Sequence, residues 1–233
     1  MRQIITVGLA RRSYQILLGK NVLSDLPNLI KNTAIGEDAC VVTTAKIQAL
    51  HGKKLKAALS KACVSVLVLT IPDSEKSKNA GLALRLIEKI TRFDKKKKLF
   101  LVAFGGGVVG DLTGFIAAIY KRGVPYIQIP TTLLAQIDSS IGGKTAIDTS
   151  YGKNLVGAFY QPRFIVSDIN LLKSLPCGQL LAGLSEAVKY ALIKDAGLYA
   201  FLKKYHQKIL KKDTRALSFL IARCAAIKAK VVA

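Results

Sequence analysis

The chain has 233 residues, of which 51% are hydrophobic, and its 36 Lys and Arg against 14 Asp and Glu give a formal net charge of +22. The apolar content excludes a disordered chain, because such chains combine high net charge with few apolar residues, and the length suffices for a large buried core. The longest stretch without a charged residue, 123–137, is too short to cross a membrane and holds two prolines, so no membrane segment is expected.

The first part of the chain alternates strand-like and helix-like segments. Apolar runs predict strands at residues 3–7, 14–18, 39–43, 64–70, 99–104, 126–130 and 164–168. Helical spacing of apolar residues predicts helices at 22–30, 47–59, 80–93, 108–119 and 131–137. Continuous apolar strands separated by helices indicate a parallel sheet that is covered on both faces.

The last third of the chain has a different pattern. A glycine-rich loop with a hairpin is predicted at 142–154, and after residue 170 only helical patterns remain, at 180–193, 197–209 and 214–232. The sequence therefore predicts an α/β fold, with a Rossmann-like parallel-sheet domain at 1–168 and an all-helical domain at 169–233. Because the last helical pattern reaches Ala233 without a capping glycine, we expect this second domain to be truncated.

The cysteine pattern indicates the cellular compartment of the protein, and its net positive charge limits the kinds of partner that it could bind. The four cysteines form no CxxC pair and no signal peptide is recognisable, which favours reduced thiols in a cytoplasmic protein. The basic excess, including the four lysines at 95–98, allows either nucleic-acid binding or a solvated lysine-rich surface. No basic stripe interleaved with aromatic residues accompanies it, so the solvated surface is favoured and no nucleic-acid partner is expected.

Residues 105–110 (GGGVVG) contain the pattern GxGxxG at a predicted strand-to-helix junction. Missing side chains and helix N–H groups at such a junction let a pyrophosphate approach closely. About 20 residues further on, where a Rossmann fingerprint has a ribose-binding acid, the chain has Ile129. The segment is therefore either a dinucleotide-binding loop that differs from the Rossmann fingerprint or a tight turn between a strand and a helix.

Two further groups of residues could bind a ligand or take part in catalysis. Asp138, Lys144 and the pair Lys153–Asn154 are bracketed by glycines, an arrangement that suits phosphate or carboxylate oxygens but also fits an exposed surface hairpin. Glu186 and Lys189 share one face of an otherwise apolar helix. Spacing alone favours a surface pair there; the alternative is a metal-ligating carboxylate beside a lysine that faces an anionic substrate.

Six motifs, in order along the chain, resemble those of the 3-dehydroquinate synthase family, and the match extends from about residue 60 to the last residue. They are 72–78 (PDSEKSK), 105–115 (GGGVVGDLTGF), 130–145 (PTTLLAQIDSSIGGKT), 152–154 (GKN), 157–162 (GAFYQP) and 182–189 (AGLSEAVK). The motifs are long, and together they are far more specific than the glycine pattern alone.

The resemblance implies a lyase that cyclises a seven-carbon keto-sugar acid phosphate (DAHP) to 3-dehydroquinate with release of phosphate, in the shikimate pathway of aromatic amino acid biosynthesis. It also implies bound NAD, a catalytic zinc or cobalt ion, and a homodimer. The alternatives are a related sugar-phosphate cyclase, an NAD-dependent polyol dehydrogenase of the same architecture, or a basic binding module without enzymatic activity.

Family roles transfer by motif position. The positions that resemble NAD-binding residues are Asp73, Ser74, Glu75, Lys76, Ser77, Lys78, Gly107, Val108, Val109, Gly110, Asp111, Thr131, Thr132, Lys144, Lys153, Leu171, Leu172, Lys173 and Ser174. Those that resemble substrate-pocket residues are Asp138, Lys144, Asn154, Lys189 and Lys228. Arg122 resembles a residue that reaches a phosphate across the dimer interface, and Glu186 resembles one zinc ligand.

Two departures from the family pattern matter. Thr44 stands where the family has an aspartate for the adenosine ribose, so we expect looser NAD binding. The other two zinc ligands of the family are histidines beyond the position of Lys228, and neither His51 nor His206 matches them. Because a catalytic zinc needs about three protein ligands, we expect this chain to be inactive by itself while it still holds NAD weakly.

Overall fold

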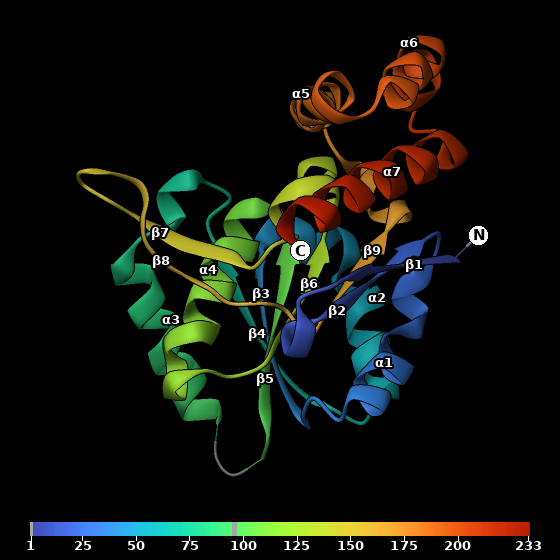
Figure 1. Ribbon diagram of the computed structural model, residues 1–233. Coiled ribbons are helices and arrows are strands. Elements are labelled where there is room, and N and C mark those ends of the chain that lie inside the picture. Colours follow the sequence, from blue (N-terminus) through green and yellow to red (C-terminus); the bar gives the residue numbers. More distant parts are fainter. Residues whose placement is uncertain (1, 95–96) are drawn as a thin grey trace.

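The computed structural model describes residues 2–94 and 97–233 and shows a mostly parallel seven-stranded sheet with helices on both faces (Figure 1). The strand order is β1-β2-β9-β6-β5-β3-β4, and β1 runs antiparallel to β2. These strands are β1 (Arg2–Val7), β2 (Tyr14–Gly19), β3 (Asp38–Thr44), β4 (Ser65–Ile71), β5 (Leu99–Gly105), β6 (Tyr126–Pro130) and β9 (Phe164–Asp168). The predicted α/β fold with a parallel sheet is confirmed.

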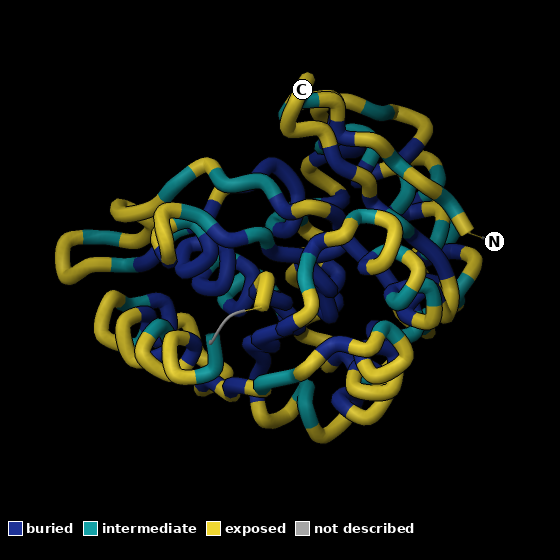
Figure 2. Tube along the Cα trace, turned by 90° about the horizontal axis from the view of Figure 1, so that it is seen from below, coloured by how far each residue is buried: buried dark blue, intermediate teal, exposed yellow. Residues whose placement is uncertain are grey.

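Two apolar layers cover the sheet. The helices are α1 (Leu26–Thr33) and α2 (Ala45–Lys61) on one face, and α3 (Ala80–Phe93) and α4 (Gly107–Ile119) on the other. Along β3, Ala39 and Val41 belong to the first layer, whereas Cys40 and Val42 belong to the second. Successive side chains of a strand point to opposite faces, so a strand buried on both sides requires a continuous apolar run. Figure 2 shows this buried centre surrounded by exposed outer faces of the helices.

A separate two-stranded hairpin, β7 (Lys144–Thr149) and β8 (Gly152–Phe159), lies against α4. A Cβ atom at Gly114 of α4 would lie 2.3 Å from Cγ2 of Thr145, so glycine is what lets the hairpin approach the helix. The strands pair closely as well, because a Cβ atom at Gly157 would lie 2.1 Å from the Thr145 carbonyl oxygen. The predicted hairpin is therefore present and extends to Phe159.

Three helices follow the sheet: α5 (Cys177–Lys194), α6 (Ala196–Leu210) and α7 (Thr214–Val232). They lie at the end of the sheet where the parallel strands have their carboxyl ends (Figure 1). Their apolar core includes Leu133 and Ile137 from the preceding part of the chain. The division into domains at 1–168 and 169–233 stays a prediction.

The predicted helix at 131–137 is wrong in its start and its form. The helical segment covers 133–139, and its last five residues, η5 (Ala135–Ser139), form a π-helix. Thr131 and Thr132 stay outside it because the Thr132 hydroxyl accepts the N–H of Ala135 at 3.2 Å and so acts as a cap.

The helix predicted at 22–30 also differs from the structure. It begins as a 3₁₀ turn, η2 (Val22–Asp25), and continues as α1. The connections between elements include two more 3₁₀ turns that bear on the site, η3 (Glu75–Ser77) and η6 (Ile169–Ser174).

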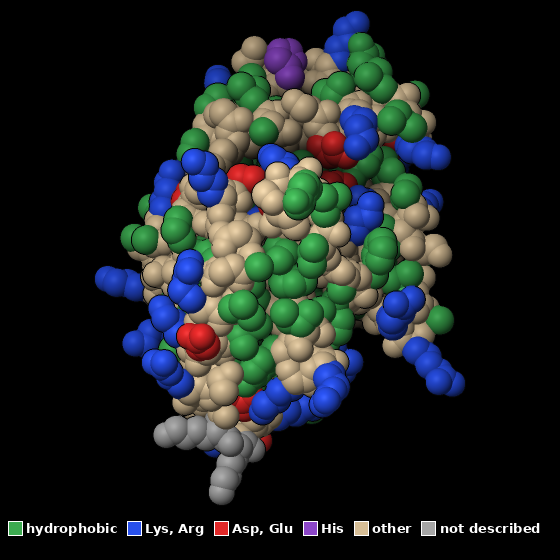
Figure 3. All heavy atoms as spheres, turned by 90° about the vertical axis from the view of Figure 1, so that its left-hand side faces the viewer, with side chains coloured by type: hydrophobic (Ala, Val, Ile, Leu, Met, Phe, Trp, Pro, Cys, Tyr) green, Lys and Arg blue, Asp and Glu red, His purple; other side chains and the backbone are tan. Residues whose placement is uncertain are grey.

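On the face shown in Figure 3, basic residues lie mostly around the edge of an apolar middle. Of the lysine run at 95–98, Lys95 and Lys96 lie outside the described residues, and Lys98 donates to the Ala34 carbonyl at 2.7 Å. No helix in the described part of the chain is long and apolar enough to cross a membrane.

Candidate functional site

A cavity of about 220 Å³ opens beyond the carboxyl ends of β3, β5 and β6. In the sheet, β3 lies between β4 and β5, so the chain crosses to opposite sides of β3, and crevices at such a point commonly bind ligands. The cavity is lined by Thr44, Lys46, Ile47, Leu50, Pro72, Asp73, Gly106, Gly107, Val108, Val109, Thr131, Thr132, Leu134, Ser174, Leu175, Pro176, Gln179 and Ala182.

The glycine turn shapes one wall of this cavity. Gly106 precedes α4 without a side-chain capping bond, so the first N–H groups of the helix remain available to an anion. A Cβ atom at Gly106 would lie 3.0 Å from Cγ2 of Thr132, so a larger residue would crowd this wall. Nearby, the buried Thr131 hydroxyl finds no hydrogen-bond partner among the described residues. The wall therefore fits the diphosphate of a dinucleotide.

The structure brings part of the expected NAD set to this cavity. The residues that line it are Asp73, Gly107, Val108, Val109, Thr131, Thr132 and Ser174. Thr44, the departure from the family pattern, also lines it, and its hydroxyl caps α2 by accepting the Ile47 N–H at 3.3 Å.

Other members of the expected NAD set lie elsewhere. Ser74, Glu75, Lys76, Lys153 and Lys173 are exposed, and Ser77, Leu171 and Leu172 are buried. Gly110 packs on Gln128, whose Oε1 would lie 2.7 Å from an added Cβ atom. Lys78 and Asp111 form an ion pair at 2.7 Å, and Lys144 lines a second cavity.

This second cavity, of about 550 Å³, gathers residues from five elements. Asp138 comes from η5, Lys144 from β7, Asn154 from β8 and Lys228 from α7, and Asp111 of α4 lines it too. Four of the five predicted substrate-pocket positions thus share one cavity. The walls present two ammonium groups, one carboxamide and the carboxylates of Asp111 and Asp138. The ammonium and carboxamide donors suit an oxygen-rich anion.

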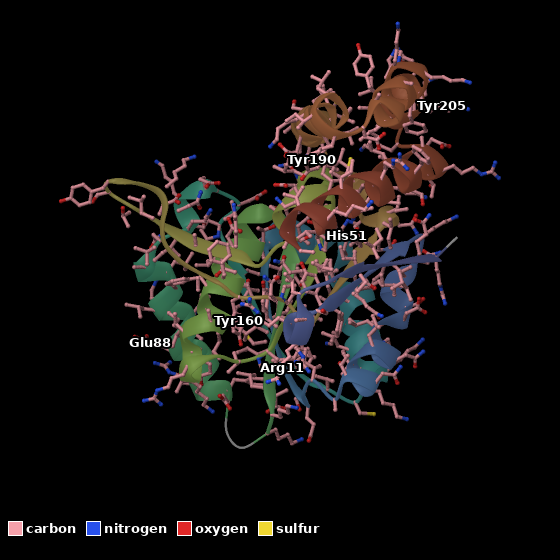
Figure 4. The ribbon with its side chains drawn as sticks, in the orientation of Figure 1. Arg11, His51, Glu88, Tyr160, Tyr190 and Tyr205 are labelled. Carbon is pink, nitrogen blue, oxygen red and sulfur yellow. The ribbon has the colours of Figure 1, made fainter. Side chains whose placement is uncertain are left out.

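Asp138 is the centre of the polar network in this cavity. Its Oδ1 atom accepts a hydrogen bond from the Lys228 ammonium at 2.6 Å and another from the Tyr190 hydroxyl at 2.5 Å. Burial raises the pKa of Tyr190, and the carboxylates of Asp138 and Glu186 raise it further, so the hydroxyl stays protonated. Figure 4 shows Tyr190 projecting from α5 on the side that faces the sheet.

Sequence reasoning missed Tyr190. The available signal was its place on the buried face of α5, together with Leu180, Gly183 and Ala187. A tyrosine on such a face needs a partner for its hydroxyl. The sequence does not say which residue that partner is.

Glu186 and Lys189 form an ion pair at 2.7 Å, in which the Lys189 side chain is 58% exposed. The hydrogen bond that Lys189 donates to the Glu186 carboxylate raises the pKa of Lys189. Among residues 2–94 and 97–233, no group of three His, Cys, Asp or Glu could hold a metal ion. The residues present therefore do not fit a complete zinc site.

Arg122 is exposed and lies outside the second cavity. It follows Lys121 in the left-handed backbone region, with φ values of +63° for Arg122 and +50° for Lys121. Lys121 is anchored to Asp94 at 2.6 Å, so this turn presents Arg122 outward. Its role at an interface between two copies stays a prediction.

Comparison with known proteins identifies the family to which the chain belongs. A model described as 3-dehydroquinate synthase N-terminal matches residues 68–182, and one described as 3-dehydroquinate synthase C-terminal matches residues 183–233. The chain is 42% identical to 3-dehydroquinate synthases of Thermodesulfovibrio yellowstonii over 228 residues and Caulobacter vibrioides over 235. These alignments cover 98% and 100% of the chain but 64% and 63% of the relatives. The chain thus spans less than two thirds of their length.

Solved structures share the fold. A 2-deoxy-scyllo-inosose synthase complexed with carbaglucose-6-phosphate, NAD+ and Co2+ matches with a TM-score of 0.84 and 25% identity, over 99% of this chain and 62% of that one. A 2-epi-5-epi-valiolone synthase from Streptomyces hygroscopicus subsp. jinggangensis, with NAD+ and Zn2+ bound, matches with a TM-score of 0.82 and 27% identity, over 92% and 59%.

Proposed function

Since the chain belongs to the 3-dehydroquinate synthase family, we propose that its two cavities serve the cyclisation of a seven-carbon keto-sugar acid phosphate to 3-dehydroquinate, with release of phosphate. The observation that carries this proposal is the convergence of Asp138, Lys144, Asn154 and Lys228 on one cavity. These residues are up to 90 positions apart in the sequence, yet Lys144, Lys228 and Asn154 present cationic and amide donors to the same space.

The first cavity is proposed to hold NAD+. The glycine turn and the uncapped start of α4 would receive the diphosphate, with Thr131, Thr132 and Ser174 around it. Bound NAD+ supplies a transient oxidation of a substrate hydroxyl, which makes the neighbouring C–H acidic. Because Thr44 uses a lone pair of its hydroxyl to cap α2 and carries no charge, we expect the ribose to be held less tightly than by an aspartate.

The second cavity is proposed to hold the anionic substrate. The Lys144 and Lys228 ammonium groups would stabilise its oxygens and the negative charge that develops on deprotonation. Asp138 fixes the Lys228 ammonium at 2.6 Å and is itself held by Tyr190. Arg122 is proposed to reach the phosphate held by a second copy of the chain, which would make the protein a homodimer.

A complete metal site is not proposed for the described residues. Glu186 is proposed as one ligand, but it forms an ion pair with Lys189, and a catalytic zinc needs about three protein ligands. We therefore propose that the 233-residue chain binds NAD+ and substrate without turning the substrate over.

Calorimetry of the 233-residue chain tests the proposal, with NAD+ first and the sugar acid phosphate second. Lys228→Met should weaken binding of the sugar acid phosphate about tenfold, because it removes a charged hydrogen bond and leaves Asp138 without its cation. Lys230→Met, on an exposed position of the same helix, is the matched control and should change affinity less than about twofold.

Three results would count against the proposal. If the chain bound neither NAD+ nor the sugar acid phosphate, the proposed function would be wrong. Accumulation of NADH on addition of a polyol would favour a dehydrogenase. Salt-sensitive binding of random DNA without NAD+ affinity would favour a basic binding module.

A further inference from the structure

Lys78 has a buried ammonium group that joins three segments of the chain. Its side chain is 4% exposed. Its Nζ atom lies 2.7 Å from Oδ2 of Asp111 on α4, 2.5 Å from Oδ1 of Asn154 on β8, and 3.7 Å from Oε1 of Glu75. One residue thus connects the loop after β4, the helix after the glycine turn and the hairpin that lines the second cavity.

Two hydrogens of the ammonium group are donated to Asp111 and Asn154. The Glu75 carboxylate is an ion-pair partner at 3.7 Å, beyond hydrogen-bond distance. Burial raises the pKa of the Asp111 carboxyl above its ordinary value, and the Lys78 ammonium offsets only part of this rise.

The same contacts fix the orientation of the Asn154 carboxamide. An ammonium group can only donate, so the atom of Asn154 that faces Lys78 must be the oxygen, and the NH2 group lies on the other side of the amide. The backbone of Asn154 is in the left-handed region, with φ of +58°, and its N–H donates to Oδ1 of Asp148 at 2.8 Å. The Asp148 N–H in turn donates to the Lys78 carbonyl at 2.7 Å.

Asn154 is therefore held by Lys78 through the side chain and, by way of Asp148, through the backbone. It lines the cavity that also contains Lys144 and Lys228. With its oxygen turned toward Lys78, the amide keeps its NH2 group as a donor, which suits phosphate or hydroxyl oxygens.

We propose that Lys78 is a positioning residue that presents the Asn154 NH2 group to an oxygen of the anionic substrate and ties the β7–β8 hairpin to the loop after β4. The proposal rests on the proposed function for the identity of the substrate.

Binding and hydrogen exchange of the 233-residue chain test this role. Lys78→Met should weaken binding of the sugar acid phosphate about tenfold, change NAD+ affinity less than about threefold, and speed amide exchange in 152–159. The double variant with Asn154→Ala should bind no more weakly than Asn154→Ala alone, because Lys78 acts through Asn154. Lys89→Met, on the exposed side of α3, is the control.

Asn154→Asp separates positioning from a merely structural role. The new carboxylate keeps an acceptor for Lys78, so hairpin protection should persist, but it removes the NH2 donor, so affinity for the sugar acid phosphate should fall at least about tenfold. The Asn154 variants keep the Lys78–Asp111 pair and serve as the test if Lys78→Met does not fold.

The outcomes separate this proposal from the proposed function. Multiplicative losses in the double variant, or loss of NAD+ binding alone in Lys78→Met, would overturn the positioning role. If the unaltered chain binds neither NAD+ nor the sugar acid phosphate, the proposed function fails. Exchange in 152–159 then still decides whether Lys78 holds the hairpin, and unchanged protection in Lys78→Met would refute it.

Discussion

Gly183 determines how closely α5 approaches the helical segment that carries Asp138. A Cβ atom at Gly183 would lie 2.7 Å from Cβ of Leu133 and 2.8 Å from the backbone nitrogen of Leu134. Ordinary van der Waals contact begins near 3.4 Å, so Gly183→Ala requires a displacement of about 0.7 Å between two helices. A backbone atom cannot move aside as a flexible side chain can.

The expected cost follows from two opposing effects. Overpacking of this kind costs about 1–3 kcal/mol, whereas alanine gains up to about 1 kcal/mol over glycine inside a helix. Gly178, on the same helix, has no atom within 4 Å of an added Cβ, so Gly178→Ala carries the propensity gain without the clash. We expect Gly183→Ala to be less stable than Gly178→Ala by about 2 kcal/mol.

Urea unfolding followed by circular dichroism measures this difference. The displacement should also disturb the 2.5 Å hydrogen bond from Tyr190 to Asp138, because Gly183 and Tyr190 lie on the same buried face of α5. Binding of the sugar acid phosphate to Gly183→Ala should therefore weaken. Equal stability of the two variants, within about 0.5 kcal/mol, would refute the reasoning.

Three further predictions concern stability, pH and metal. Tyr190→Phe should lower the unfolding free energy by about 1 kcal/mol, measured with urea, because the Asp138 carboxylate loses a donor. Burial lowers the pKa of His51 from its ordinary value of 6.5, and the charge of Lys54 lowers it further, so the unfolded chain takes up this proton at a higher pH than the folded chain. Stability should therefore be complete above about pH 6.5 and fall as the pH drops below it, and His51→Gln should flatten this profile. Titration with zinc should show no stoichiometric tight binding by the 233-residue chain.

Each of these has an outcome that contradicts it. An unchanged urea midpoint for Tyr190→Phe would mean that its hydrogen bond contributes nothing net. A pH profile of His51→Gln identical to that of the unaltered chain would place the acid sensitivity elsewhere. Tight zinc binding that Glu186→Gln abolishes would show a metal site that the described residues do not reveal.

The sheet could be predicted from the sequence because strands that are buried on both faces appear as continuous apolar runs. The run at 99–104 is apolar throughout, and the structure has β5 at Leu99–Gly105 with every residue buried. The glycine turn was predictable for the same reason, since a strand followed by glycines and a helix is a local pattern. The π-helix of η5 was not, because one or two residues of altered spacing cannot be recognised in so short an apolar segment.

The partners of charged residues could not be predicted, because they depend on contacts between distant segments. Spacing alone favoured a surface pair for Glu186 and Lys189, and the structure shows them paired, with Lys189 more than half exposed. The same kind of reasoning gave no partner for Asp138, whose contact with Lys228 spans 90 residues. Local spacing therefore identifies candidate residues better than it identifies the network that they form.

In a lysine-rich chain the sequence does not show which lysines have specific partners, whereas their burial in the structure does. Removing an ammonium group from water costs several kcal/mol unless acceptors surround it, so a buried lysine in such a chain needs specific partners to remain there. Lys78, at 4% exposure, has acceptors that are 33 and 76 residues away in the sequence. Lys121, at 60% exposure, keeps its carboxylate partner while most of its side chain stays in solvent. The two look alike in the sequence, and only the tertiary contacts show that Lys78 should be the costlier of the two to replace.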